Sequence, residues 1–179
     1  MSRAITDIKS IIDRCIEFDQ IDENLSFARK ENINLSQLLR ELITQDEHRD
    51  VTWVESIQPD LWVLADAHYL SVVLNNLIDN ACKYRAPDSS VEITLGSLHP
   101  QAQSLSQRIF FSISNQVGRS GFPDSNRIFE KYYRSPGAMK SSGTGLGLFL
   151  VSNLSKKMGV QCQYVPTSER VRFELWFPS

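Results

Sequence analysis

The chain has 179 residues, of which 41% are hydrophobic and 22% are charged, and 19 Lys and Arg against 21 Asp and Glu give a formal net charge of −2. This composition is too apolar for a disordered chain and too evenly charged for a nucleic-acid-binding protein with a general basic surface. The length indicates one globular domain with room for a short additional element.

No segment reaches the roughly 18 to 20 consecutive apolar residues that a membrane span requires, and residues 1–13 lack the apolar centre of a signal peptide. The three cysteines, Cys15, Cys82 and Cys162, are far apart and form no C-x-x-C pair. We therefore expect a cytoplasmic chain without membrane contact of its own, in which the cysteines are reduced, packed thiols.

The first predicted elements are two helices and two strands. Residues 1–28 carry apolar groups at a heptad-like spacing, which is typical of a helix that packs on another helix. A short helix is expected at residues 35–44 with Asn34 as its N-cap, followed by strands at 51–57 and 61–65.

The clearest helix covers residues 66–85, because its apolar residues recur at i, i+3, i+4, i+7 and i+8. Its expected N-cap is Asp66. The later elements, in chain order, are antiparallel strands at 91–98 and 108–115, a mobile Ser/Gly/Pro-rich segment at 135–144, a helix at 145–158, and strands at 160–165 and 170–177. This order predicts an α/β (α+β) fold with helices on one face of a mixed, mostly antiparallel sheet.

Three polar residues of the 66–85 helix, Asn76, Asn80 and Lys83, follow one another at i, i+4 and i+7. This spacing places them on one side of the helix, away from the apolar stripe. An amide oxygen beside a lysine suits Mg²⁺ and the phosphates that the ion bridges. Asparagine is also common on solvated helix faces, so this pattern alone does not define a site.

A glycine-rich segment at residues 143–147, with the sequence GTGLG, precedes the last predicted helix. Glycine lets the backbone approach a phosphate, and a helix N-terminus supplies free N–H groups. A flexible hinge at the start of a helix would show the same pattern. Between the two motifs lies the aromatic and basic segment 129–134, which by itself fits an amphipathic turn with core aromatics better than a binding site.

In this order and spacing, the three motifs resemble the N box (76–84), the F box (129–133) and the G2 box (143–147) of the ATP-binding catalytic domain of bacterial sensor histidine kinases. The resemblance extends over nearly the whole chain from about Leu35 to Pro178. It implies the two-layer sandwich of the Bergerat, or GHKL ATPase, fold, with ATP and Mg²⁺ bound beside the N-box helix under a lid that joins the F and G2 boxes.

The resemblance also implies a role for individual residues. Asn80 would ligate Mg²⁺, Asn76 would support the ion or its water, and Lys83 and Tyr84 would contact phosphate and ribose. Arg134 would lie near the γ-phosphate, with Lys140 as a further candidate. Asn76, Lys83 and Arg134 are the residues expected to be catalytic. The residues expected to bind ATP are Asn80, Tyr84, Asn115, Gly118, Gly121, Lys140, Gly143, Thr144, Gly145, Leu146 and Gly147.

The expected adenine-binding segment, the G1 box, departs from the family pattern. There a strand ends in an Asp that accepts a hydrogen bond from the adenine amino group, whereas here the strand ends in Asn115 and Val117 falls in strict register. We favour Asn115 as the adenine partner, because its amide oxygen can accept a hydrogen bond at a strand end. The missing charge predicts weaker base recognition.

None of the three histidines, His48, His68 and His99, has the flanking residues of the family's phosphoacceptor. Residues 1–30 resemble the end of the dimerisation hairpin, and residues 31–179 resemble the catalytic domain. We therefore expect a fragment of a longer kinase, or a natural short form, that is homodimeric at full length. Its expected partners are a dimerisation domain that carries the substrate histidine and the receiver domain of a response regulator, and no nucleic acid.

Asn76 separates two activities within the wider superfamily. Gyrase, MutL and the heat-shock chaperone of ninety kilodaltons resemble this chain in the N-box helix but carry a Glu there as general base, and an amide cannot accept a proton at neutral pH. The resemblance therefore implies a protein-histidine kinase rather than an ATP hydrolase. The altered G1 box leaves an alternative open, a degenerate domain that acts as a protein-interaction module.

Overall fold

The computed structural model describes residues 29–45, 48–98, 108–140 and 143–178. The predicted helix at 1–28, Cys15 and His99 lie outside them. In chain order the elements are β1 (Lys30–Asn34), α2 (Leu35–Ile43), β2 (Trp53–Ile57), β3 (Trp62–Asp66), α3 (Ala67–Tyr84), β4 (Val91–Leu98), β5 (Arg108–Gln116), the 3-10 helix η2 (Pro136–Lys140), α4 (Gly147–Met158), β6 (Gln161–Tyr164) and β7 (Arg170–Trp176).

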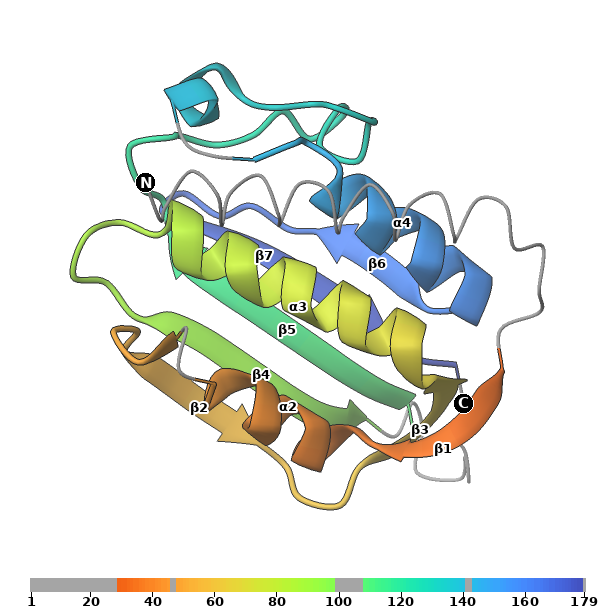
Figure 1. The fold of residues 1–179 in the computed structure, drawn as a ribbon. Coiled ribbons are helices and arrows are strands. Elements are labelled where there is room, and N and C mark those ends of the chain that lie inside the picture. The colour runs from red at the N-terminus through yellow and green to blue at the C-terminus, as the bar shows by residue number, and fades with distance from the viewer. Residues whose placement is uncertain (1–28, 46–47, 99–107, 141–142, 179) are drawn as a thin grey trace, which may run out of the picture.

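The strands form a five-stranded sheet in the order β2-β4-β5-β7-β6 and a separate two-stranded sheet of β1 and β3. Among the described strands, β2 and β4 alone pair in parallel, and the other neighbours are antiparallel. The α-helices lie on one face of the larger sheet (Figure 1). This arrangement confirms the expected two-layer fold with a mixed, mostly antiparallel sheet.

Two helices begin at the predicted caps. The Asp66 side chain accepts a hydrogen bond from the backbone N–H of Tyr69 at 3.0 Å and starts α3. The Asn34 side chain accepts one from Gln37 at 3.0 Å and starts α2. Because an N-cap satisfies a backbone donor that the first helical turn leaves unpaired, these short polar residues fix where each helix begins.

The core lies between the helices and the sheet. The inward-facing residues of α3 are almost fully buried and include Leu70, Val73, Leu74, Leu77 and Ile78. They meet the inward-facing side of β5, where Phe111 and Ile113 are at most 1% exposed. Each such side chain stabilises the fold by about 1.5 to 3 kcal/mol through burial, so the core fixes α3 firmly over β5.

Two details differ from the expectation. The strands at 51–57 and 61–65 exist, but they belong to different sheets, and β1 joins the second of them. The last helix begins at Gly147 rather than residue 145, whereas it ends at Met158 as expected, with Gly159 as its C-cap at a φ of 76°. Among the described residues, no helix combines the length and the apolar composition needed to cross a bilayer.

Candidate functional site

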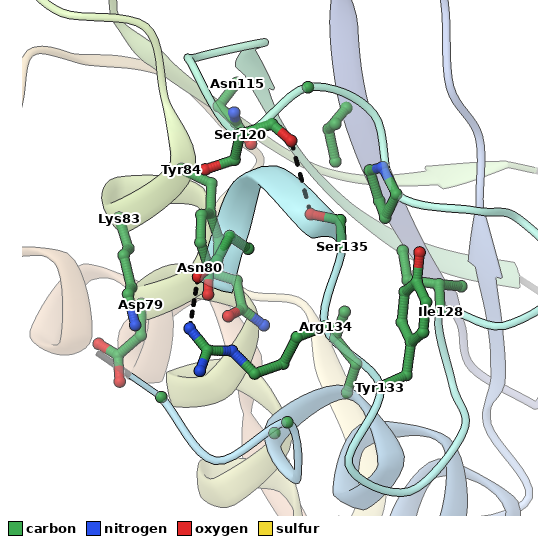
Figure 2. A pocket seen from close by; sticks show the side chains of 18 of the residues that line it. Asp79, Asn80, Lys83, Tyr84, Asn115, Ser120, Ile128, Tyr133, Arg134 and Ser135 are labelled. Atoms are coloured by element: carbon green, nitrogen blue, oxygen red, sulfur yellow. Dashed lines mark hydrogen bonds between the residues drawn. The ribbon is translucent and has the colours of Figure 1, made fainter. Parts of the chain in front are cut away.

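A cavity lies at the C-terminal end of α3, under the loop that carries η2 (Figure 2). It holds about 1000 Å³ of space, part of it open to solvent. The N-box helix, the end of β5, the F-box segment and the glycine-rich segment all contribute to its wall. Of the residues predicted from the sequence, those that line it are Asn80, Lys83, Tyr84, Asn115, Gly121, Arg134, Gly143, Thr144, Gly145 and Gly147.

Four predicted residues are not placed at the cavity wall. Gly118 lies behind it, in the G1 loop that follows β5 (residues 117–123), where its backbone N–H donates to the carbonyl of Tyr84 at 3.1 Å and joins this loop to the end of α3. Leu146, within the glycine-rich segment, is only 2% exposed and does not line the cavity. The side chain of Lys140 lies outside the described part of the chain. The fourth is Asn76, whose burial corrects the prediction that it shares an open side of the helix with Asn80 and Lys83.

Asn76 is buried, with 6% of its surface exposed, and does not share an open rim with Asn80 and Lys83. The reason is that α3 packs against α4 as well as β5, so more of its circumference is covered than one apolar stripe indicates. The Asn76 Nδ2 donates to the carbonyl of Val72 at 2.8 Å. Its Oδ1 is buried and has no hydrogen-bond partner among the described residues, so one acceptor beside Asn80 remains unsatisfied.

The C-terminal end of α3 carries a cationic, an anionic and two neutral polar side chains. The Lys83 ammonium lies 5.2 Å from the ring centroid of Tyr84, and both side chains face the cavity (Figure 2). Asp79 also lines the cavity next to Asn80. Sequence reasoning missed Asp79, because no spacing pattern distinguishes this residue from an ordinary surface aspartate.

Arg134 extends across the cavity toward Asn80 (Figure 2). Its guanidinium donates to the backbone carbonyl of Ala138 in η2. Lys83 and Arg134 together place two cationic groups around the cavity, against one carboxylate from Asp79. Such an arrangement favours an anionic ligand, and guanidinium groups bind phosphate oxygens with charge-assisted hydrogen bonds.

The first half of the segment at 135–144, expected from the sequence to be mobile, is folded against the G1 loop. Ala138 is 6% exposed, and the Ser135 hydroxyl donates to the carbonyl of Ser120 at 3.5 Å. A Cβ added to Gly137 would lie 2.5 Å from the same carbonyl oxygen. The close approach therefore requires glycine, and sequence alone did not reveal its partner.

The other end of the cavity is formed by Asn115 at the end of β5 (Figure 2). Asn115 is 3% exposed, and its Nδ2 donates to the carbonyl of Gln116 at 3.0 Å. Because the amide nitrogen is engaged, the oxygen Oδ1 is the acceptor left for a ligand. Val117, the alternative partner in strict register, also lines the cavity.

An apolar wall, which sequence reasoning did not assign to the site, encloses the space between the two ends. It includes Ile128, Tyr133, Leu148, Val171 and Phe173. The hydroxyl of Tyr133 accepts a hydrogen bond from the backbone N–H of Asp124 at 2.9 Å, which fixes this ring. In the sequence, the aromatic F-box pattern was the only indication of this apolar wall. Taken together, the cationic end, the Asn115 end and the apolar wall suit a ligand with two parts. One part is flat and apolar and donates a hydrogen bond, and the other is anionic.

Neither of the two described cysteines is a plausible nucleophile for this site. Burial raises the pKa of Cys82 to about 11 and that of Cys162 to about 12. Both are free thiols, and neither is a wall residue of the cavity. Within the described residues, no group of three or more His, Cys, Asp or Glu side chains is arranged to hold a metal ion.

Comparison with known families and curated proteins gives consistent matches. The family described as "Histidine kinase-, DNA gyrase B-, and HSP90-like ATPase" matches residues 65–179. The swarming motility regulation sensor protein RssA of Serratia marcescens is 37% identical over 102 residues, covering 57% of this chain and 20% of RssA. The sensor protein VanSC of Enterococcus gallinarum is 28% identical over 149 residues, covering 82% of this chain and 39% of VanSC. The chain therefore spans between a fifth and two fifths of these relatives.

Solved structures show the same fold. The mycobacterial sensor histidine kinase MprB superposes with a TM-score of 0.68 at 21% identity, covering 83% of this chain and 97% of the MprB chain. Full-length ShkA, solved in complex with AMPPNP, gives a TM-score of 0.71 at 24% identity, covering 98% of this chain and 37% of ShkA.

Proposed function

The chain belongs to the family of histidine kinase-, DNA gyrase B- and HSP90-like ATPases, and we propose that it is the ATP- and Mg²⁺-binding catalytic domain of a sensor histidine kinase. The observation that carries this proposal is the meeting of the N box, F box and G2 box around one cavity whose two ends differ in chemistry. The domain would transfer the γ-phosphoryl group of ATP to a histidine that this chain does not supply.

The cationic end of the cavity suits the triphosphate. Lys83 and Arg134 would neutralise the phosphate oxygens, and the backbone of the glycine-rich segment at 143–147 can approach them closely. Phosphoryl transfer depends mainly on positioning and charge neutralisation, so these groups are the ones that the reaction requires.

The residues present also fit a magnesium ion. Mg²⁺ prefers oxygen ligands and commonly keeps phosphates and waters among them. Asn80 presents an amide at the cavity wall, and the unsatisfied Oδ1 of Asn76 is a suitable acceptor for a water one helical turn away. When bound, the ion would neutralise charge on the phosphates, while Asn80 would hold it and Asn76 would orient its surroundings.

The polar and apolar groups at the other end suit the adenine base. The Oδ1 of Asn115 can accept a hydrogen bond from an exocyclic amino group, since its Nδ2 donates to Gln116. Val171 and the ring of Phe173 provide apolar contact beside it. A base that presents a carbonyl oxygen to Asn115 would be disfavoured, because two acceptors would then face each other.

Kinase activity is favoured over ATP hydrolysis by the chemistry of Asn76. Hydrolysis requires a base for water, and the Asn76 amide cannot accept a proton. A neutral imidazole is already a nucleophile and needs no such base. We also infer that the domain is cytoplasmic and that it acts, as part of a homodimer, on a dimerisation domain of the same kinase. The receiver domain of a response regulator would be the next phosphoryl acceptor.

Calorimetric titration of the chain with ATP, with and without Mg²⁺, tests the proposal. We expect saturable binding that is strengthened by Mg²⁺. If the folded chain binds no ATP at millimolar concentrations, the kinase assignment is wrong and the alternative of a protein-interaction module takes its place.

A further inference from the structure

Three polar side chains form a closed network on the face of the sheet that the helices leave uncovered. The Arg170 guanidinium donates from Nε to the hydroxyl of Ser114 at 3.1 Å and from Nη2 to the carbonyl of Ser114 at 3.3 Å. The same Nη2 lies 3.1 Å from the carboxylate of Glu92. The Ser114 hydroxyl in turn donates to Glu92 at 3.2 Å.

This network joins the three inner strands β4, β5 and β7 at one end of these strands. Glu92 lies near the start of β4, Ser114 near the end of β5, and Arg170 is the first residue of β7. At this end β5 passes into the G1 loop, and the backbone ladder with β7 continues to Gln116, which pairs with Arg170, and to the Val117 N–H, which donates to the carbonyl of Glu169 at 2.9 Å. The network adds side-chain bonds from β5 to both of its neighbours, β4 and β7, and an ion pair between those two strands.

The network lies directly behind the base end of the cavity. Successive residues of a strand point to opposite faces, so Asn115 and Val171, which follow Ser114 and Arg170, point to the helix side. Asn115 and Val171 are direct partners in the register of β5 and β7, and both line the cavity. Movement of the strand end would therefore move the Asn115 amide relative to a bound base.

We propose that Arg170 is a positioning residue for base recognition, which acts through Ser114 and Glu92 on the orientation of Asn115. The inference rests on the proposed function, because it assumes a nucleotide in the cavity. Arg170 suits this role better than lysine would, since its fork of donors reaches both oxygens of Ser114 and the carboxylate of Glu92 at once. Arg170 is not among the described residues that line the cavity.

The test compares ATP with inosine triphosphate, which carries an oxygen in place of the adenine amino group. In Arg170→Met the aliphatic stem is kept and the guanidinium is lost. We expect the preference for ATP over inosine triphosphate to fall roughly fivefold, with binding of inosine triphosphate little changed. Arg170→Lys should retain part of the preference. Arg172→Met is the matched control, because Arg172 lies on the same face and pairs with Glu174 of its own strand at 3.9 Å.

A second variant keeps the inference testable if Arg170→Met folds poorly, and a double variant tests whether Arg170 acts through Asn115. Glu92→Gln should lower the same preference to a smaller extent. In an Asn115→Ala background, adding Arg170→Met should cause no further loss of preference. Equal weakening of both nucleotides, or an unchanged preference, would overturn the positioning role while leaving ATP binding established. A failure of the unchanged chain to bind ATP would overturn the proposed function and this inference with it.

Discussion

The backbone N–H of Tyr132 donates to the carbonyl of Gly145 at 3.0 Å and joins the F box directly to the G2 box. Both residues have a left-handed backbone, with φ of 65° for Tyr132 and 73° for Gly145. A Cβ added to Gly145 would lie 2.7 Å from the carbonyl carbon of Tyr132. Both ends of the loop over the cavity are thus held at one point, and Gly145 is the residue that permits it.

Gly145→Ala should therefore destabilise the fold and weaken ATP binding together. The left-handed conformation costs a side chain about 1 to 2 kcal/mol, and the overlap with Tyr132 adds roughly 1 to 3 kcal/mol. Urea unfolding measures the total. Gly159→Ala is the control, because Gly159 has a similar φ of 76° with nothing within 4 Å of an added Cβ. Equal losses in the two variants would show that the contact with Tyr132 has no energetic role.

Asn80→Ala should abolish the Mg²⁺-dependent part of ATP binding and leave the fold intact, because Asn80 lines the cavity and is not part of the core. We expect at least about a tenfold loss of affinity in the presence of Mg²⁺, and no phosphoryl transfer when the dimerisation hairpin is supplied. Asn75→Ala, on the same helix but away from the cavity wall, should bind as the unchanged chain does. An Asn80→Ala protein with undiminished transfer would contradict the assignment.

Two residues of the G1 segment compete for the role of base partner, and substitution separates them. Asn115→Ala removes the acceptor, so the preference for ATP over inosine triphosphate should disappear. Val117→Ala removes only apolar contact, so both nucleotides should bind roughly threefold more weakly with the preference unchanged. Competitive binding measurements with the two nucleotides decide the matter. Loss of preference in Val117→Ala alone would place the base at Val117 instead.

The sequence predicted best those features that depend on neighbouring residues in the chain. Asn34 and Asp66 mark helix starts because a cap is a local hydrogen bond. Strand β1, with the sequence KENIN, carries a single apolar side chain at Ile33 and has no alternation to detect. It exists because β3 pairs with it, and that partner lies about thirty residues away in the chain.

The same distinction holds for the site. The motifs predicted which segments meet at the cavity, but not the burial of Asn76 or the packing of η2. Burial of Asn76 depends on the second helix packed against α3, and the position of η2 depends on contact between Gly137 and Ser120. These contacts are tertiary, and no periodicity in the sequence reports them.

The loop over the cavity should respond to nucleotide in a protease assay. Without ATP, trypsin should cleave after Lys140 only slowly if the contacts of η2 with the G1 loop persist, and more slowly still with ATP and Mg²⁺ bound. Gly137→Ala should accelerate cleavage without nucleotide, because its Cβ would press against the carbonyl of Ser120. Cleavage after Lys30, in β1, provides the control. Equal rates at Lys140 with and without saturating nucleotide would count against a phosphate-gated loop.

The chain alone should bind ATP without labelling itself with phosphate. Phosphoryl transfer requires an imidazole in line with the γ-phosphate at close approach. His68 lies in the first turn of α3, and twelve residues of helix at 1.5 Å each separate it from Asn80 by about 18 Å. His48 is 7% exposed, with its ring against that of Trp53 at 6.0 Å between centroids, which leaves it no freedom to reach a phosphate. His99 follows β4 and lacks an acceptor's flanking residues.

Incubation with ATP labelled at the γ-phosphate, followed by acid treatment, measures this directly. We expect no acid-labile label on the isolated chain, and strong labelling once an upstream hairpin with its own histidine is added. The Asn80→Ala variant with the same hairpin controls for labelling that does not depend on the cavity. Acid-labile phosphate at His48, His68 or His99 of the isolated chain would show that it contains its own acceptor, and that the proposed division between catalytic domain and substrate histidine is wrong.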